Sequence, residues 1–186
     1  MNWSEYKELS EKTLSTQFHC DDKKIELLLH AVMGILTELD ELSDWKDDIN
    51  RREEIADSFW YLALLDRTLN LNLDFDNYDL ENLSKYGIEN DKLVLTLFKK
   101  TSFLLDILKK KIYYDKKIDY DKISEISIEI HGILHLFCKL NRVDIYEILE
   151  KNINKLRIRY GEKFSTDKAI NRDLDKEREE LSKYIK

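Results

Sequence analysis

Residues 38 to 57, within the stretch TELDELSDWKDDINRREEIADSFWYLALL (37–65), carry two pairs of acidic residues at the same spacing. In an α-helix, residues three positions apart lie on one face, so each pair presents two carboxylates side by side. The polar connection 46–52 between the two segments is short, which predicts that the second helix returns antiparallel to the first. Two such helices would bring four carboxylates together. These carboxylates belong to Glu38 and Glu41 on the first helix and to Glu54 and Asp57 on the second.

Four carboxylates in a partly dry site need a counter-charge, because each would otherwise be driven toward protonation by its neighbours. Mg²⁺ prefers oxygen ligands and often completes its coordination shell with substrate phosphate. The sequence therefore predicts a site for Mg²⁺, or for Mn²⁺, and favours a nucleotide phosphate as the substrate. The predicted metal ligands are Glu38, Glu41, Glu54 and Asp57. A solvated acidic face is the alternative, since a chain with 38 acidic residues contains many such pairs by chance.

The second acidic helix is apolar around most of its circumference. Its apolar residues are Phe59, Trp60, Tyr61, Leu62, Leu64 and Leu65. This pattern indicates burial on several sides, so Asp57 would be costly there without a partner. On the first acidic helix, Gly34 lies on the edge that carries the carboxylates, and we expect it to leave room for a ligand.

The composition favours one all-α domain over the 186 residues. The chain has no proline, only four glycines and no sustained alternation of apolar and polar residues. A formal charge of −7 argues against binding of a nucleic-acid polymer, and no run of apolar residues is long enough to cross a membrane. Two distant cysteines and a charged N-terminal segment fit a cytoplasmic protein.

Helices are predicted along the whole chain. They cover roughly 2–15, the segment from 24 through the first acidic pair, 53–71, a short piece at 79–87, 92–111, 121–140, 145–161 and the charged tail after Ser165. The four longest segments before residue 145 predict a four-helix core.

An internal repeat is visible in this order. Residues 69–87 resemble 140–161, with Asn82 matching Asn152 and Lys85 matching Lys155. Repeat 1, about 25–87, keeps the four acids, and repeat 2, about 92–161, keeps the basic Asn-x-x-Lys segment. Near the acidic positions, repeat 2 has Lys100, Phe103 and Ile126 instead. We therefore expect an internally duplicated, pseudo-dimeric bundle followed by the charged tail 162–186; a homodimer is the alternative assembly.

The pattern ELDE, twelve residues and then EIAD resembles the signature of the MazG-like, all-α nucleoside triphosphate pyrophosphohydrolases. The stretches LLHAVMGILTELDELSD, EEIADSFWYLALL and NINKLRIRYGEKFSTDKAINRDLDKERE are similar to segments of one phage and bacterial branch. The resemblance covers most of the chain except residues 72 to about 140. In that branch one copy usually holds all these segments, so the interruption again favours a degenerate duplication.

The resemblance implies a hydrolase that uses Mg²⁺ to direct water at the α-phosphorus of a nucleoside triphosphate, favouring a dNTP, and releases the monophosphate and pyrophosphate. It assigns the metal to the four acids, with Glu41 or Glu38 orienting or deprotonating the water. Lys155 and Arg159 match the phosphate-binding positions, Asn152 belongs to the same substrate-binding motif, and Arg172 is a further candidate.

Several residues have two interpretations. Trp60 is either a core residue or a platform for the base, and His30 is a candidate for hydrogen bonding to the base. His131, His135 and Cys138 share a helix face, which would suit a soft metal, but their apolar surroundings favour core positions. A non-catalytic interaction module, or a metal-responsive binding protein, is therefore the competing functional class.

Overall fold

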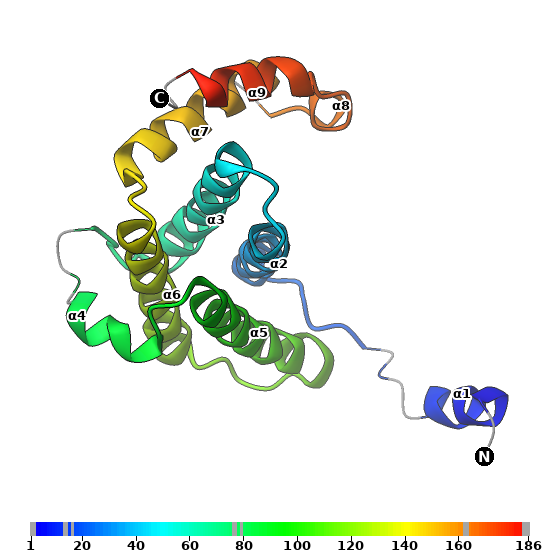
Figure 1. The fold of residues 1–186 in the computed structure, drawn as a ribbon. Coiled ribbons are helices and arrows are strands. Elements are labelled where there is room, and N and C mark those ends of the chain that lie inside the picture. Colours follow the sequence, from blue (N-terminus) through cyan, green and yellow to red (C-terminus); the bar gives the residue numbers. More distant parts are fainter. Residues whose placement is uncertain are drawn as a thin grey trace.

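The structure is a computed structural model that describes residues 3–12, 15, 17–75, 78, 80–161 and 164–183. Within these residues it contains helices and no strands, which confirms the predicted all-α fold (Figure 1). The elements are α1 (Trp3–Glu11), α2 (Lys23–Ser43), α3 (Asp48–Leu69), α4 (Leu80–Leu83), the 3₁₀ turn η1 (Ser84–Tyr86), α5 (Asn90–Tyr114), α6 (Tyr120–Leu140), α7 (Ile145–Tyr160), α8 (Thr166–Ile170) and α9 (Leu174–Ser182).

Aspartate side chains set the beginnings of the helices that build the site. Asp22 accepts a hydrogen bond from the backbone N–H of Lys24 (2.8 Å), and Asp47 accepts one from that of Asn50 (2.9 Å). Such caps satisfy N–H groups that have no partner within the helix. Since only residues 44–47 separate α2 from α3, the two helices form the expected antiparallel pair.

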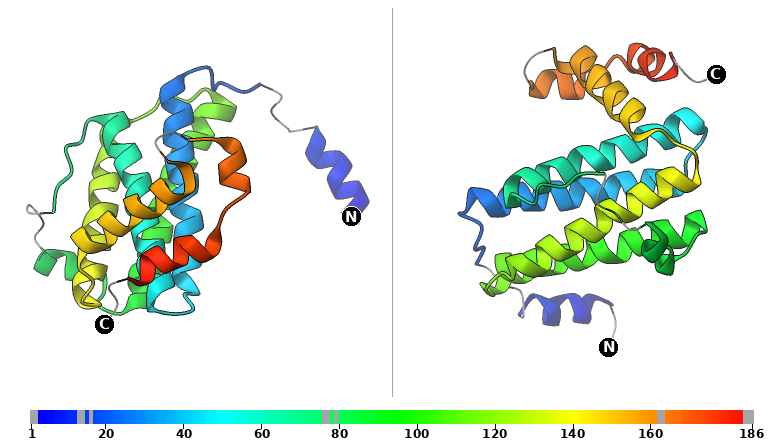
Figure 2. Two further views of the ribbon diagram at one scale, coloured as in Figure 1. Left: turned by 90° about the horizontal axis from the view of Figure 1, so that it is seen from above. Right: turned by 90° about the vertical axis from the view of Figure 1, so that its left-hand side faces the viewer.

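Helices α2, α3, α5 and α6 form the four-helix core, and α7, α8 and α9 form a layer across one side of it (Figures 1 and 2). Apolar residues at helical spacing along α2, namely Leu28, Val32, Ile35, Leu39 and Leu42, are buried. Helix α3 contacts α2, α6, α7 and α9, which confirms its burial on several sides. Helix α1 lies apart from this core (Figures 1 and 2).

Each half of the core is crossed by the segment that follows the other half. Helix α4, which follows α3, contacts α6, whereas α7, which follows α6, contacts α3. On α6, a side chain at Gly132 would lie 2.8 Å from Leu83 and from Tyr78, so the glycine permits this close approach. The arrangement has the reciprocity that a pseudo-dimer requires, although the duplication itself remains a prediction.

The main differences from the predicted elements lie at the two ends of the chain. The tail contains two helices, because Ser165 caps α8 and Asp173 caps α9. The first helix is shorter than predicted and ends at Glu11. Residues 2, 13, 14 and 184–186, to which the predicted terminal helices extended, lie outside the described part of the chain.

No helix among the described residues has the length and apolar character that a membrane span requires.

The cap of α3 gives a test of the local structure. Asp47 also accepts a hydrogen bond from Arg178 of α9 (2.6 Å), so it has two separable roles. We expect Asp47→Ala to lower the free energy of unfolding by about 1 kcal/mol through loss of the cap. Asp47→Asn should keep the cap and lose only the exposed ion pair, so its unfolding free energy should change by at most a few tenths of a kcal/mol. Equal losses in urea titrations of the two variants would contradict this division.

Candidate acidic site between α2, α3 and α7

The antiparallel packing of α2 on α3 brings three of the four predicted ligands into one group. Glu38, Glu54 and Asp57 each place a carboxylate oxygen within 4.8 Å of the others. Glu41 is exposed and lines the same hollow, but it is not part of this group. The convergence follows from the acid spacing and the short loop; binding of a metal there remains a prediction.

Burial and the charges of neighbouring acids raise the pKa values of two of these acids, Glu38 and Glu54. The pKa of Glu54 is raised to about 9, mainly by burial and to a smaller extent by the charges of Glu41 and Glu53. Burial and the charge of Asp57 raise the pKa of Glu38 to about 7. Without a cation, the cluster therefore holds protons at neutral pH, as expected for crowded carboxylates.

Helix α7 supplies a buried positive charge to the same cluster. The ammonium group of Lys155 is almost fully buried and donates to Glu53 (3.0 Å) and to Asp57 (2.5 Å). Burial alone would lower the pKa of Lys155, but the charges of Asp57 and Glu53 raise it. The side-chain amide of Asn152 donates to the other oxygen of Asp57. Lys155 and Asn152 thus contact the acids directly, and their predicted contact with substrate remains untested.

The other two predicted phosphate-binding residues converge on one carboxylate of α9. Arg159 donates to both oxygens of Glu177, at 2.9 and 2.5 Å, and Arg172 donates to one of them at 2.7 Å. Burial alone would raise the pKa of Glu177, but the hydrogen bonds from these two arginines lower it to about 2. The structure therefore brings Arg159 and Arg172 together, with Glu177 between them.

A hollow of about 930 Å³ connects the acids with these arginines. Its lining includes Glu38, Glu41, Glu53, Glu54, Asp57, His30, Trp60, Tyr61, Arg159, Arg172 and Glu177. The ring of His30 meets those of Trp60 and Tyr61 edge to face, with centroids 6.3 and 5.6 Å away. Trp60 is 40% exposed, so the core interpretation of this residue is wrong. One opening thus presents carboxylates, guanidinium groups and aromatic rings.

The expected role of Gly34 needs correction. A Cβ atom at Gly34 would lie 2.2 Å from the Tyr61 ring, so that ring fills the space that we expected a ligand to use. Tyr61 lies four positions after Asp57 and therefore shares its helix face. This spacing could have revealed Tyr61, and the same spacing links Glu53 to Asp57. Glu177 had no comparable signal of helical spacing, because Arg172 precedes α9 and Arg159 lies on α7.

The histidine and cysteine residues of α6 lie in or against the interior, and His135 is half-buried. His131 and Cys138 are buried, and burial lowers the pKa of His131 to about 4 and raises that of Cys138 to about 12. His131 stacks on Phe75 with a centroid distance of 4.8 Å. Among the described residues, this helix face provides no cluster of three potential metal ligands. The core interpretation therefore accounts for these residues better than a soft-metal site.

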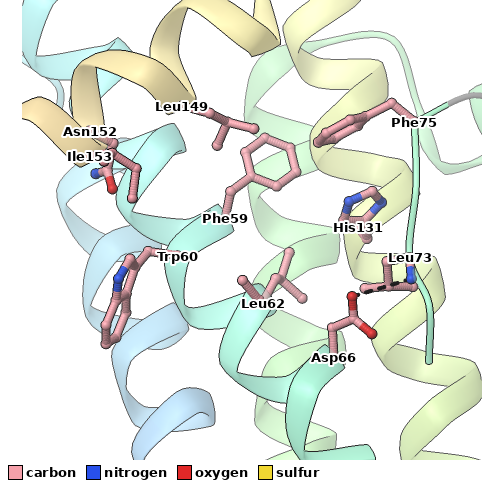
Figure 3. Close-up of a pocket in the computed structure, with 11 residues that line it drawn as sticks. Phe59, Trp60, Leu62, Asp66, Leu73, Phe75, His131, Leu149, Asn152 and Ile153 are labelled. Atoms are coloured by element: carbon pink, nitrogen blue, oxygen red, sulfur yellow. Dashed lines mark hydrogen bonds between the residues drawn. The ribbon is translucent and has the colours of Figure 1, made fainter. Parts of the chain in front are cut away.

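A smaller apolar pocket of about 300 Å³ lies beside His131 (Figure 3). Phe59, Phe75 and Leu149 face it, and Asp66 at its edge accepts a hydrogen bond from the backbone N–H of Leu73 (3.3 Å). Trp60 lines both this pocket and the larger hollow. The converging acids Glu38, Glu54 and Asp57, however, line the larger hollow, which makes that hollow the candidate site.

No match exists to a family model, to a curated protein or to a solved structure. The chemistry of the hollow and the resemblance of its motifs therefore remain the basis for a proposed function.

The raised pKa values predict that the metal-free protein loses stability as the pH rises. In the unfolded chain, Glu38 and Glu54 have the ordinary pKa of 4.5, so between pH 4.5 and about 9 the folded state binds more protons. Its free energy of unfolding must then fall with increasing pH in this window. We expect Glu54→Gln to remove most of this decrease and to be more stable than the parent at pH 8, measured by urea denaturation with EDTA. The exposed Glu179→Gln is the control, and an unchanged slope in Glu54→Gln would contradict the prediction.

The buried ion pairs of Lys155 give a second stability prediction. Lys155→Met leaves Asp57 and Glu53 without their buried counter-charge, so we expect a loss of about 3 kcal/mol in unfolding free energy. The double variant Lys155→Met/Asp57→Asn should recover part of that loss, because the unpaired charge is removed. Lys176→Met, which removes an exposed ion pair with Asp173, serves as the control. Strictly additive losses in the double-mutant cycle would argue against direct coupling.

Proposed function

We propose that this protein is a Mg²⁺-dependent nucleoside triphosphate pyrophosphohydrolase that converts a (d)NTP to the (d)NMP and pyrophosphate, with Mn²⁺ as an alternative metal. The main support is the convergence of Glu38, Glu54 and Asp57 in a hollow that also contains Arg159 and Arg172. These are the residues that the resemblance assigns to the metal and to the phosphates. They come from distant parts of the chain, which a chance acidic face would not require.

The three converging carboxylates, together with Glu41 at the same opening, would hold the metal. Their oxygen chemistry and mutual proximity suit a hard divalent cation, and the raised pKa values of Glu38 and Glu54 are consistent with a cluster that favours added positive charge. When bound, Mg²⁺ would lower the pKa of a bound water and offset charge on the phosphates. Glu41, exposed in the hollow and outside the three-acid group, is the best placed to orient or deprotonate the attacking water.

The remaining groups divide between the two ends of a nucleotide. The guanidinium groups of Arg159 and Arg172 suit phosphate oxygens, because their N–H groups match two acceptors at once. Trp60, His30 and Tyr61 offer ring surfaces for the base. Lys155 offsets the charge of Asp57 from within the protein and lies on the same helix as Arg159. The hollow therefore contains chemical partners for the phosphates and for the base.

We further propose one complete centre per chain, with acids from repeat 1 and basic residues from repeat 2. Near the positions of repeat 2 that would correspond to the acids of repeat 1, Lys100 forms an ion pair with Glu129 (2.7 Å). The Tyr86 hydroxyl donates a hydrogen bond to the same carboxylate (2.6 Å). The charge of Glu129 is already neutralised by Lys100, which supports the proposal that repeat 2 has lost a metal site. The chain would then act as a monomeric pseudo-dimer.

The activity has a direct test. Pyrophosphate release should be screened over the common NTPs and dNTPs with Mg²⁺, Mn²⁺ or EDTA. We expect Glu38→Gln and Asp57→Asn each to lower turnover more than about 100-fold, because loss of a metal ligand should exceed the usual effect of an outer partner. The circular dichroism spectrum should remain helical, and Glu179→Gln should retain activity. Nucleotide binding without turnover on any substrate would favour a non-catalytic binding protein.

The single-centre proposal predicts the outcome of mixing two variants. Asp57→Asn lacks an acid and Lys155→Ala lacks the buried base, so a site shared between chains would regain activity when both are mixed. We expect no rescue and a ratio of one bound nucleotide analogue per chain by calorimetry. Strong rescue, or two analogues per chain, would show that the internal pseudo-dimer is wrong.

A further inference from the structure

Glu177 has an unusual position for a residue of a highly charged helix. Its side chain is only 3% exposed, and Leu181 is the other buried residue of α9. Helix α9 lies beside α7 at the candidate site (Figures 1 and 2), and Glu177 itself lines the hollow. A buried charge is retained only with partners, and here the partners are Arg159 and Arg172.

The contacts of Glu177 have the geometry that these arginines would offer to a phosphate. Arg159 uses Nε and Nη2 on the two carboxylate oxygens, and Arg172 adds a third hydrogen bond. A planar guanidinium group binds carboxylate and phosphate oxygens in the same two-point manner. Arg159 and Arg172 carry two positive charges, and the single carboxylate of Glu177 offsets only one of them. A polyphosphate has enough negative charge to offset both.

We infer that Glu177 is an internal anion that occupies the phosphate-binding arginines in the ligand-free protein, and that a polyphosphate displaces it and releases α9. The inference rests on the proposed function for the identity of the anion, a nucleotide's polyphosphate chain. Glu177 is thus an autoinhibitory contact: it lowers affinity for the substrate until enough negative charge arrives to replace it.

The other attachments of α9 make this displacement feasible. Its ion pair from Arg178 to Asp47 joins two side chains that are 55% and 42% exposed, and such pairs contribute little stability. Apart from Leu181, its hydrophobic contribution to the core is small. If Glu177 stayed in place, its charge would face the incoming phosphates in a hollow that already contains five other carboxylates, those of Glu38, Glu41, Glu53, Glu54 and Asp57. Repulsion therefore favours its departure.

Inorganic tripolyphosphate is the probe, used with EDTA and without nucleotide so that neither metal binding nor catalysis contributes. By calorimetry, we expect Glu177→Gln to bind it at least about fivefold more tightly than the parent, since a competing internal ion no longer reduces the competent fraction. Glu179→Gln makes the same charge change on an exposed part of α9 and should leave the affinity unchanged. Arg159→Ala should weaken binding about tenfold or more, whereas Arg157→Ala, on the same helix but exposed, should have a small effect.

Hydrogen exchange of the parent provides a readout that needs no variant. Tripolyphosphate should increase amide exchange across residues 174–182, because α9 loses its main anchor. Unchanged or weaker binding by Glu177→Gln, or slower exchange in α9 when the parent binds the probe, would overturn the inference. Absence of NTP hydrolysis with both results as expected would contradict the proposed function alone, and hydrolysis without them would contradict only the displacement of Glu177.

Discussion

The crowding of negative charge between α2 and α3 is the constraint on which the site depends. Glu38, Glu54 and Asp57 converge on one point, and two of them have strongly raised pKa values. Such a cluster persists only if protons, an internal cation or a bound cation offsets its charge. The protein uses protons and Lys155 for this purpose. The position of α7 follows from the same requirement, because this helix carries both Lys155 and the amide that contacts Asp57.

Two further clusters in the protein also place charged side chains against partners of opposite charge. Glu177 contacts both Arg159 and Arg172 and offsets one of their two charges, while Glu129 neutralises Lys100 in the other half of the core. The acids of α2 and α3 gather around the buried Lys155, and Arg159 and Arg172 share a single carboxylate, so each of these clusters has more charge of one sign than of the other. Such clusters are prepared for a ligand, whereas the matched ion pair of Lys100 and Glu129 is complete in itself.

The sequence was informative where a local pattern determines a structural outcome. The spacing of Glu38, Glu41, Glu54 and Asp57 defines helix faces, and the short connection between the pairs leaves little choice but an antiparallel return. The apolar stripe of α2 likewise follows from a 3.6-residue period. These features required no knowledge of distant contacts. The capping side chains of Ser165 and Asp173 are a local signal that the prediction of one tail helix did not use, and they account for the division of the tail into two helices.

Partner choice across the bundle could not be predicted in this way. The ring of Tyr61 fills the space beside Gly34 because of the face that α3 presents to α2. The packing of the whole core determines that face. The contacts of Glu177 with two arginines depend on the position of α9. That position is set by the connections from α7 to α8 and from α8 to α9. Lys155 was expected to face substrate, but its contact with Asp57 depends on how α7 crosses α3. The periodicity of one helix carries no information about such a crossing.

The reciprocal crossing of α4 and α7 also affects the order in which the site forms during synthesis. Lys155 is 98 residues away from Asp57 along the chain, so the acidic hairpin emerges from the ribosome long before its buried cation. Until α7 is made, protons or ions from solution must take the place of Lys155 beside Asp57. Closure of so long a loop is slow compared with formation of the hairpin. The nascent protein therefore passes through a state in which the acidic pair of helices is complete while its electrostatic partner does not yet exist.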